Sequence, residues 1–117
     1  MIGQILIVLI ALLHLYILVL EIFLWDKPSG LKAFGNTLEK AQLTKVMAQN
    51  QGLYNGFLAA GLLWSLYAPE SYALALANFF LGCVLVAGIY GGLTASKKII
   101  YIQALPALVA LIAVNLF

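Results

Sequence analysis

The chain has 117 residues, of which 65% are hydrophobic and 9% are charged, and its net charge is +2. Soluble domains usually carry about 25% charged residues, so this composition indicates a membrane protein. The six positive residues are all lysines, and no arginine occurs in the sequence. They form no basic block, so nucleic acid is not an expected partner.

Four long apolar segments follow one another along the chain and fill nearly all of it. They cover residues 2–25, 46–67, 72–95 and 99–117, approximately. Each is close to or above the roughly 20 residues that cross a hydrocarbon core. Backbone inside a membrane must satisfy its own hydrogen bonds, so the segments are predicted to be transmembrane helices. We expect the first segment to remain as a span, because no positive residue precedes it as in a signal peptide.

The connections between these segments predict how the helices are arranged. Two connections are short, which makes neighbouring helices antiparallel. Residues 1–117 are therefore predicted to be one domain, an all-α, antiparallel up-down bundle of four transmembrane helices. In the long connection, residues 26–45, a turn is expected near Pro28, and Asn36 or Thr37 is a candidate helix N-cap. Residues 38–45 would then extend the second helix, and Pro106 should kink the fourth.

The lysines predict the orientation in the membrane. Four lie in the first connection and two in the third, at positions 27, 32, 40, 45, 97 and 98. The positive-inside rule places these two connections in the cytoplasm, so both termini should lie outside. The predicted location is the bacterial inner (cytoplasmic) membrane, with membrane lipids as surroundings. The other acidic residues, Asp26, Glu39 and Glu70, are expected in solvent.

Polar residues within the apolar segments are the candidate functional residues, because such groups are costly in a membrane. Counting about 1.5 Å per residue from the cytoplasmic helix ends gives two layers. Glu21 falls in a shallower layer and His14 in a deeper one with Asn55. The shallower layer also includes the following residues: Asn50, Gln51, Tyr90 and Gln103. This polar interior is predicted to open toward the cytoplasm.

Two interpretations of these residues remain open. In the functional one, His14 and Glu21 are catalytic candidates or ligand anchors that handle a proton. The candidate ligand-binding residues are Asn50, Gln51, Tyr54, Asn55, Tyr90 and Gln103. In the other interpretation the same groups only hold helices together, at about 0.6–2 kcal/mol per bond.

No metal site or cofactor is expected, because His14, Glu21 and Cys83 do not form a set of three or four ligands at suitable spacing. Cys83 is expected to act as a small buried hydrophobic residue. Glycines at positions 52 and 56 continue to Ala60 as a small-residue ridge typical of close helix packing. A chain this small would enclose a pocket more readily as a homo-oligomer, either a dimer or a trimer.

Two segments carry a resemblance to a known family. The chain resembles small bacterial four-helix membrane proteins in residues 13–25, which include His14, Glu21 and Trp25. It also resembles them in residues 50–59, Asn-Gln-Gly-Leu-Tyr-Asn-Gly-Phe-Leu-Ala. This family is catalogued as a domain of unknown function. The resemblance covers essentially the whole chain and implies the same four-helix membrane architecture, with no established activity.

A fainter similarity exists to MAPEG proteins, which are trimeric four-helix membrane enzymes acting on lipophilic substrates with glutathione. It is carried by the helix order, the orientation and the polar start of the second helix, Ala48-Gln49-Asn50-Gln51. The MAPEG motif in that helix contains an arginine and a glutamate, and this sequence has no such pair. Glutathione chemistry of that kind is therefore not expected.

The sequence thus leads to one favoured function and two alternatives. The favoured one is binding of a lipophilic small molecule in a polar pocket that faces the cytoplasm, with chemical transformation of that molecule left open. The alternatives are an oligomeric pathway for protons or small solutes and an accessory membrane subunit with purely structural polar contacts. Enzymatic activity is left undecided by the residues alone.

Overall fold

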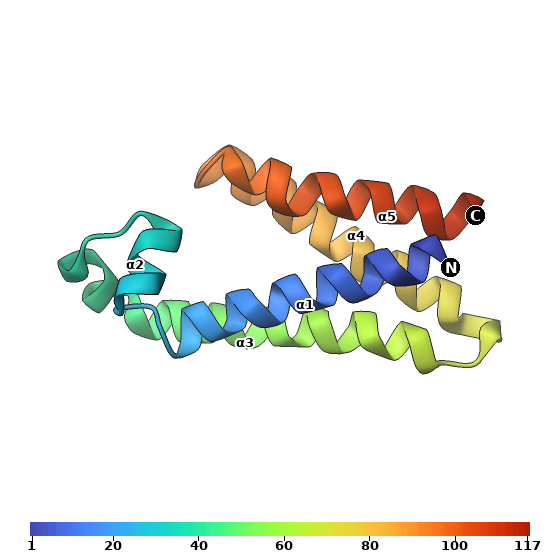
Figure 1. Ribbon diagram of the computed structural model, residues 1–117, viewed down its shortest axis with the longest axis horizontal. Helices are drawn as coiled ribbons and strands as arrows, with labels where there is room; N and C mark the ends of the chain where they lie inside the picture. The colour runs from blue at the N-terminus through green and yellow to red at the C-terminus, as the bar shows by residue number, and fades with distance from the viewer. The chain divides into compact units, whose positions relative to one another are not determined.

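The protein is entirely helical in a computed structural model that describes residues 1–117 (Figure 1). Its elements are α1 (Ile2–Ile22), α2 (Pro28–Phe34), α3 (Leu38–Tyr67), α4 (Glu70–Thr94), the π-helix η1 (Ile100–Ala104) and α5 (Leu105–Leu116). The prediction of an all-α fold is confirmed.

The ends of α1 and α3 differ from the simple limits of the apolar segments. α1 ends at Ile22, three residues before the predicted limit, and the Leu24 amide then bonds to the Val19 carbonyl five residues back. α3 begins at Leu38, where Thr37 is the N-cap and its Oγ1 accepts a 3.2 Å hydrogen bond from the Lys40 amide. The predicted helical extension before residue 46 is therefore confirmed.

The short helix α2 was not predicted, because the Lys27–Gly30 stretch was interpreted only as a turn. Pro28 begins this helix, and proline is favoured at the first helical position because its missing N–H would have no helical partner there. Gly35 ends it in the left-handed conformation, with φ of 65°. Both signals are present in the sequence, as a proline and a glycine seven residues apart.

The chain divides into two compact units. The first consists of Met1–Leu12 and Leu58–Phe117, and the second of Leu13–Phe57. α1 and α3 therefore each contribute residues to both units.

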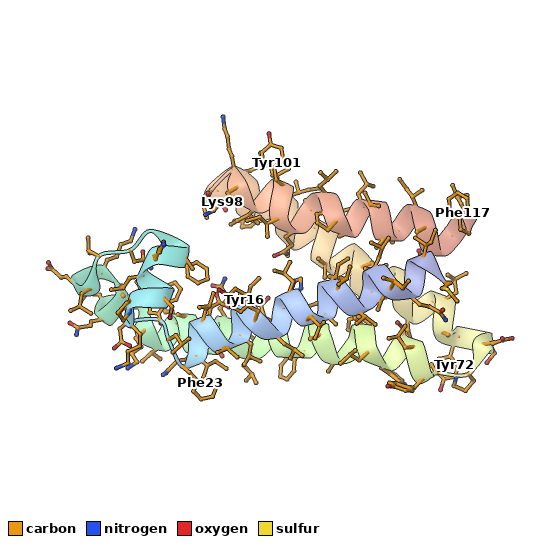
Figure 2. The ribbon with its side chains drawn as sticks, viewed as in Figure 1. Tyr16, Phe23, Tyr72, Lys98, Tyr101 and Phe117 are labelled. Carbon is orange, nitrogen blue, oxygen red and sulfur yellow. The ribbon has the colours of Figure 1, made fainter.

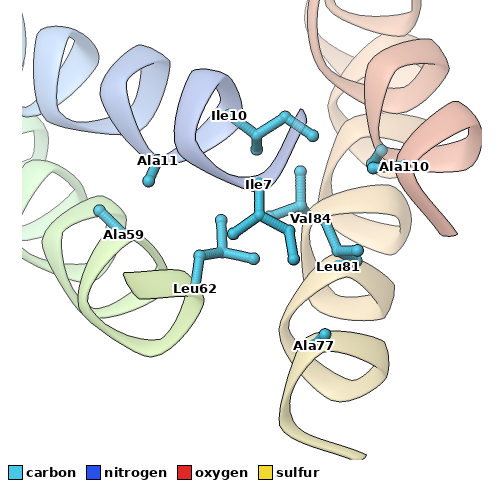
Figure 3. Close-up of a cluster of buried hydrophobic side chains, with 10 residues drawn as sticks. Ile7, Ile10, Ala11, Ala59, Leu62, Ala77, Leu81, Val84 and Ala110 are labelled. Carbon is cyan, nitrogen blue, oxygen red and sulfur yellow. The ribbon is translucent and has the colours of Figure 1, made fainter. Parts of the chain in front are cut away.

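In the first unit, a core of aliphatic and small side chains joins four helical segments (Figure 3). Leu62, Leu81 and Val84 are its largest fully buried aliphatic side chains. α4 and α5 run antiparallel, since Asn78 of α4 pairs with Asn115 of α5 while Gly88 faces Ala104 at the other end. At Gly88 a Cβ atom would lie only 2.7 Å from the Ala104 nitrogen, so the absence of a side chain permits this approach.

The fourth apolar segment contains a change of helix type where a proline kink was predicted. Residues Ile100–Ala104 form a π-helix, and the Leu105 amide bonds to the Ile100 carbonyl five residues back. Pro106 follows in the first turn of α5. The π-helix thus comes before the proline rather than at the middle of the helical segment. Pro106 itself fits the first turn of α5, because proline needs no N–H partner there.

In the second unit, α2 and the segment around it are held against α3. The Trp25 indole donates a 3.1 Å hydrogen bond to Thr44, and its ring centroid lies 4.8 Å from that of Phe34. Lys45 forms a 3.2 Å ion pair with Asp26. At Gly30 there is no room for a Cβ atom, because the Leu24 carbonyl oxygen occupies its position.

Two helices, α1 and α4, are long and apolar enough to cross a membrane by length and composition, and the apolar stretch Ile100–Leu116 is shorter. α3 is not among them, since Asn50, Gln51 and Asn55 interrupt its apolar run. Many large apolar side chains are exposed, and those of Tyr16, Phe23 and Tyr101 extend outward from their helices (Figure 2). The surface is thus compatible with membrane association.

Candidate functional site

The candidate site centres on Glu21, in the last turn of α1. Its side chain is buried, with 2% exposure. The carboxylate oxygen Oε1 accepts a 2.6 Å hydrogen bond from Nδ2 of Asn55 on α3. Both residues belong to the second unit, so one compact unit holds this pair together.

Two glycines of α3 allow α1 to come this close. A Cβ atom at Gly52 would lie 2.7 Å from Ile22 Cγ1 and 3.1 Å from Glu21 Cβ, and one at Gly56 would lie 2.8 Å from Leu18 Cδ1. Rising residue numbers on α3 therefore face falling numbers on α1, and the two segments are antiparallel. The glycines predicted for close packing lie in this contact.

We predicted that Asn55 lies in one layer with His14 rather than with Glu21. This prediction is wrong, because Asn55 bonds to Glu21. The depth of Glu21 was counted from Trp25 as though the helix reached that residue, whereas α1 ends at Ile22. Gly52 is level with Glu21, which places Glu21 about 10 Å along α3 from Lys45. Glu21 is therefore deeper than the count from Trp25 predicted. Side chains lean toward the N-terminus of their own helix, so in antiparallel helices Glu21 and Asn55 lean toward each other.

His14 lies two turns before Glu21 on the same face of α1, and it is fully buried. The face that His14 and Glu21 share is thus buried at both positions. The spacing of seven residues corresponds to about 10 Å along the helix axis. The two side chains are therefore too far apart to bond to each other directly.

On α3, polar side chains change from buried to exposed beside Glu21. Asn55 is half-buried, and Gln51, one turn earlier and on the same face, is exposed. Asn50 is exposed as well, and Tyr54 is exposed with its ring 5.7 Å from that of Phe57. The pair Glu21–Asn55 therefore connects the interior of the unit to a polar surface at Gln51.

The remaining two candidate residues belong to the first unit. Gln103 donates a 3.1 Å hydrogen bond from Nε2 to the Val84 carbonyl, which links η1 to α4. Tyr90 on α4 is exposed. Of the predicted ligand-binding residues, Asn55 forms a hydrogen bond with Glu21, and Gln103 instead binds a helix backbone.

Charge in the second unit is concentrated outside the apolar part of α1. The Lys45 ammonium donates a hydrogen bond to Asp26. This hydrogen bond and the positive charge of Lys45 lower the pKa of the aspartate below its ordinary value. Asp26 is thus half-buried in an ion pair rather than freely solvated as predicted, whereas Glu39 and Glu70 are exposed as expected. Glu21, by contrast, has a neutral amide as its hydrogen-bond donor.

Several polar groups of the first unit were not singled out from the sequence. Ser65 is buried, and its hydroxyl donates a 2.6 Å hydrogen bond to the Leu62 carbonyl in its own helix. Asn78 and Asn115 exchange two hydrogen bonds, of 3.2 and 2.7 Å, between α4 and α5. A cavity of about 210 Å³ adjoins Ser65, and Gln4 is the other polar side chain in its lining. The presence of one asparagine in each of the two antiparallel segments was the only sequence signal for this pair.

Two expectations about Cys83 and metals can be compared with the structure. Cys83 is only half-buried, because one side of α4 around Gly82 and Val86 is open. No group of three or more histidine, cysteine, aspartate or glutamate side chains lies close enough to hold a metal ion. The chemistry available at Glu21 is therefore that of a carboxylate with amide neighbours.

The fold and the site together define the class as a small all-helical protein with membrane-compatible helices and a buried carboxylate between two of them. The family model described as "Protein of unknown function (DUF1304)" matches residues 8–115, so the chain belongs to this family. The resemblance to a domain of unknown function is thereby confirmed. The chain is also similar to "Uncharacterized protein YpaA" of Lactococcus lactis subsp. lactis (strain IL1403), with 33% identity over 107 residues. That alignment covers 90% of this chain and 89% of the relative, and no solved structure matches.

Proposed function

We propose that α1, α3, α4 and the η1–α5 segment cross the bacterial cytoplasmic membrane as four transmembrane helices. The length and composition of α1 and α4 support this arrangement, and so does the large number of exposed apolar side chains. Residues 46–67 of α3 extend about 33 Å, enough to cross the hydrocarbon core. The lysines in the connections favour cytoplasmic positions for residues 26–45 and 95–99, with both termini outside.

In this membrane protein, the Glu21–Asn55 pair binds a lipophilic small molecule. The observation that carries the proposal is the 2.6 Å hydrogen bond to a carboxylate that is 2% exposed, between the apolar helix α1 and the amide-bearing part of α3. Burying a carboxylate costs free energy, and a contact that served only to join helices would be made as well by two amides. A carboxylate at this position is therefore better explained by a ligand.

The route to the site follows the polar residues of α3. Gln51 is exposed, Asn55 is half-buried and Glu21 is buried, so a ligand's polar group would pass from the first to the last. Its apolar part would remain against exposed apolar side chains of the two helices. Such an arrangement fits an amphiphilic molecule dissolved in the inner leaflet.

His14 has a different place in the proposal. It is buried two turns away on the same helix face and has no direct bond to Glu21. A proton passing between the two would need a bridging group, which a bound ligand could supply. Binding is the proposed function, and His14 is a candidate for any chemistry on the bound molecule.

The proposal is tested by native mass spectrometry of the protein released from lipid nanodiscs. Wild type should carry a molecule of discrete mass that is absent from Glu21→Gln. The matched control is Glu39→Gln, which makes the same chemical change at an exposed position of α3 and should retain the molecule. The same adduct on all three proteins, or none on wild type, would contradict the proposal. Proton flux into liposomes that Glu21→Gln abolishes would instead support the conduction alternative.

A further inference from the structure

The charge environment of Glu21 indicates which class of ligand the proposed site would accept. The hydrogen bond to Glu21 comes from the neutral amide of Asn55. The one ion pair in the structure joins Lys45 to Asp26, so this lysine already has a carboxylate partner. The chain contains no arginine, and all its lysines lie outside the apolar part of α1 that holds Glu21. No lysine of the second unit is therefore paired with the Glu21 carboxylate.

A buried carboxylate without a cation is unfavourable, and a ligand with a positive charge would remove this cost. A neutral ligand would supply no opposite charge. From this charge complementarity we infer that the molecule bound at the Glu21–Asn55 site is a lipophilic organic cation. The inference rests on the proposed function and specifies its ligand.

The amides beside Glu21 fit the same ligand class. Asn55 uses its donor group, Nδ2, on Glu21, which leaves its carbonyl oxygen as an acceptor for an N–H group or a partial positive charge. Gln51 lies one turn away on the same face and offers a second amide, which is exposed. A carboxylate with amide oxygens around it attracts a cation and disfavours an anion.

The exposed surface of α3 in this unit also carries aromatic side chains, and such side chains suit a cation with bulky hydrophobic substituents. Tyr54 precedes Asn55 and is exposed, and its ring packs edge-on against Phe57, which is also exposed. Aromatic faces attract organic cations through their negative π-surface. A small hydrated ion would gain nothing from these rings.

The inference is tested by isothermal titration calorimetry of detergent-solubilised full-length protein with tetraphenylphosphonium. Triphenylphosphine oxide serves as a neutral probe with similar aromatic bulk. We expect wild type to bind the cation at least about tenfold more tightly than the neutral probe. Glu21→Gln should lose this preference, while Glu39→Gln should keep it.

A second pair of variants keeps the comparison possible if Glu21→Gln does not fold. Glu21→Asp and Glu21→Asn have side chains of the same size and differ in charge alone, so the aspartate variant should retain cation binding and the asparagine variant should not. Unfolding temperatures in the same detergent show which variants are folded. Equal binding of both probes, with or without Glu21, would overturn the cation inference but leave the proposed ligand site intact. Failure of both probes would overturn the inference, and the native mass measurement would decide the proposed function separately.

Discussion

Glu21 and Asn55 form the most informative contact in the chain at the scale of single residues. The contact joins a buried carboxylate to a half-buried amide at 2.6 Å, and Gly52 and Gly56 provide the space for it. A buried acceptor that loses its donor costs more than a pair of groups that are both removed, because the remaining group is desolvated without compensation. This asymmetry distinguishes a true bond from two polar groups that are merely close.

We predict that Asn55→Leu destabilises the protein by about 1–2 kcal/mol, since it leaves the Glu21 carboxyl group without its donor. The double variant Glu21→Leu/Asn55→Leu should recover part of this loss, because no polar group then remains buried at the contact. The measurement is unfolding in detergent followed by circular dichroism.

The control for this cycle is Gln51→Leu, which makes the same kind of change one turn away on the same face of α3, at an exposed position. It should alter the free energy of unfolding by less than about 0.5 kcal/mol. Equal effects of Asn55→Leu and Gln51→Leu would show that the Asn55–Glu21 bond contributes nothing to stability.

At the scale of whole elements, glycines decide how closely the helices pack. α4 offers the clearest contrast, since two of its glycines have opposite surroundings. A Cβ atom at Gly88 would lie 2.7 Å from the Ala104 backbone nitrogen, whereas one at Gly82 would have no atom within 4 Å. The first glycine is required by the contact between α4 and η1, and the second is not.

The pair Gly88→Ala and Gly82→Ala should therefore change stability in opposite directions. Gly88→Ala forces two backbones apart and should destabilise by about 1–3 kcal/mol, as overpacking does. Gly82→Ala restricts the unfolded chain without a clash and should stabilise by about 0.5–1 kcal/mol. Both are measured by thermal unfolding in one detergent. Destabilisation by both substitutions would mean that the Gly82 side of α4 is covered in the native protein.

At the scale of the whole molecule, the central question is the relation of the helices to a membrane. α1 and α4 are able to cross, α3 carries amides in its apolar part, and the stretch Ile100–Leu116 is shorter. The lysines provide the argument for orientation because they all lie in the first and third connections. The proposed four-span topology places Ser29 and Ser71 on opposite sides of the membrane.

This topology predicts the labelling of single cysteines by a maleimide that cannot cross membranes. In a Cys83→Ser background, Ser71→Cys in the first turn of α4 should be labelled in intact cells. Ser29→Cys in α2 should be labelled only after the cells are permeabilised. The two serines are matched because both are exposed. The reverse pattern would contradict the orientation, and labelling of both in intact cells would contradict the membrane topology.

Part of the candidate site could be predicted from the sequence. Glu21 and His14 stood out because ionisable residues are rare in apolar segments, and both are buried as expected of a shared helix face. The pairing of Asn55 with Glu21 could not be obtained by counting residues. It depends on where α1 ends and on the level at which Gly52 meets α1, and these are properties of two helices in contact.

The sequence by itself determined the all-α fold, the extension of α3 before residue 46 and the family, because these follow from local signals: long apolar runs, Thr37 as a cap and recognisable segments. It also contained the signals for α2, in Pro28 and Gly35, although they were interpreted as a turn. Only the tertiary structure decided that Asp26 pairs with Lys45, that Asn78 pairs with Asn115 and that Gln103 binds the Val84 carbonyl. The physical reason is that a side-chain hydrogen bond requires two groups within about 3 Å. Residues 19 or 37 positions apart reach that distance only through helix packing, which is set by shape rather than by local sequence.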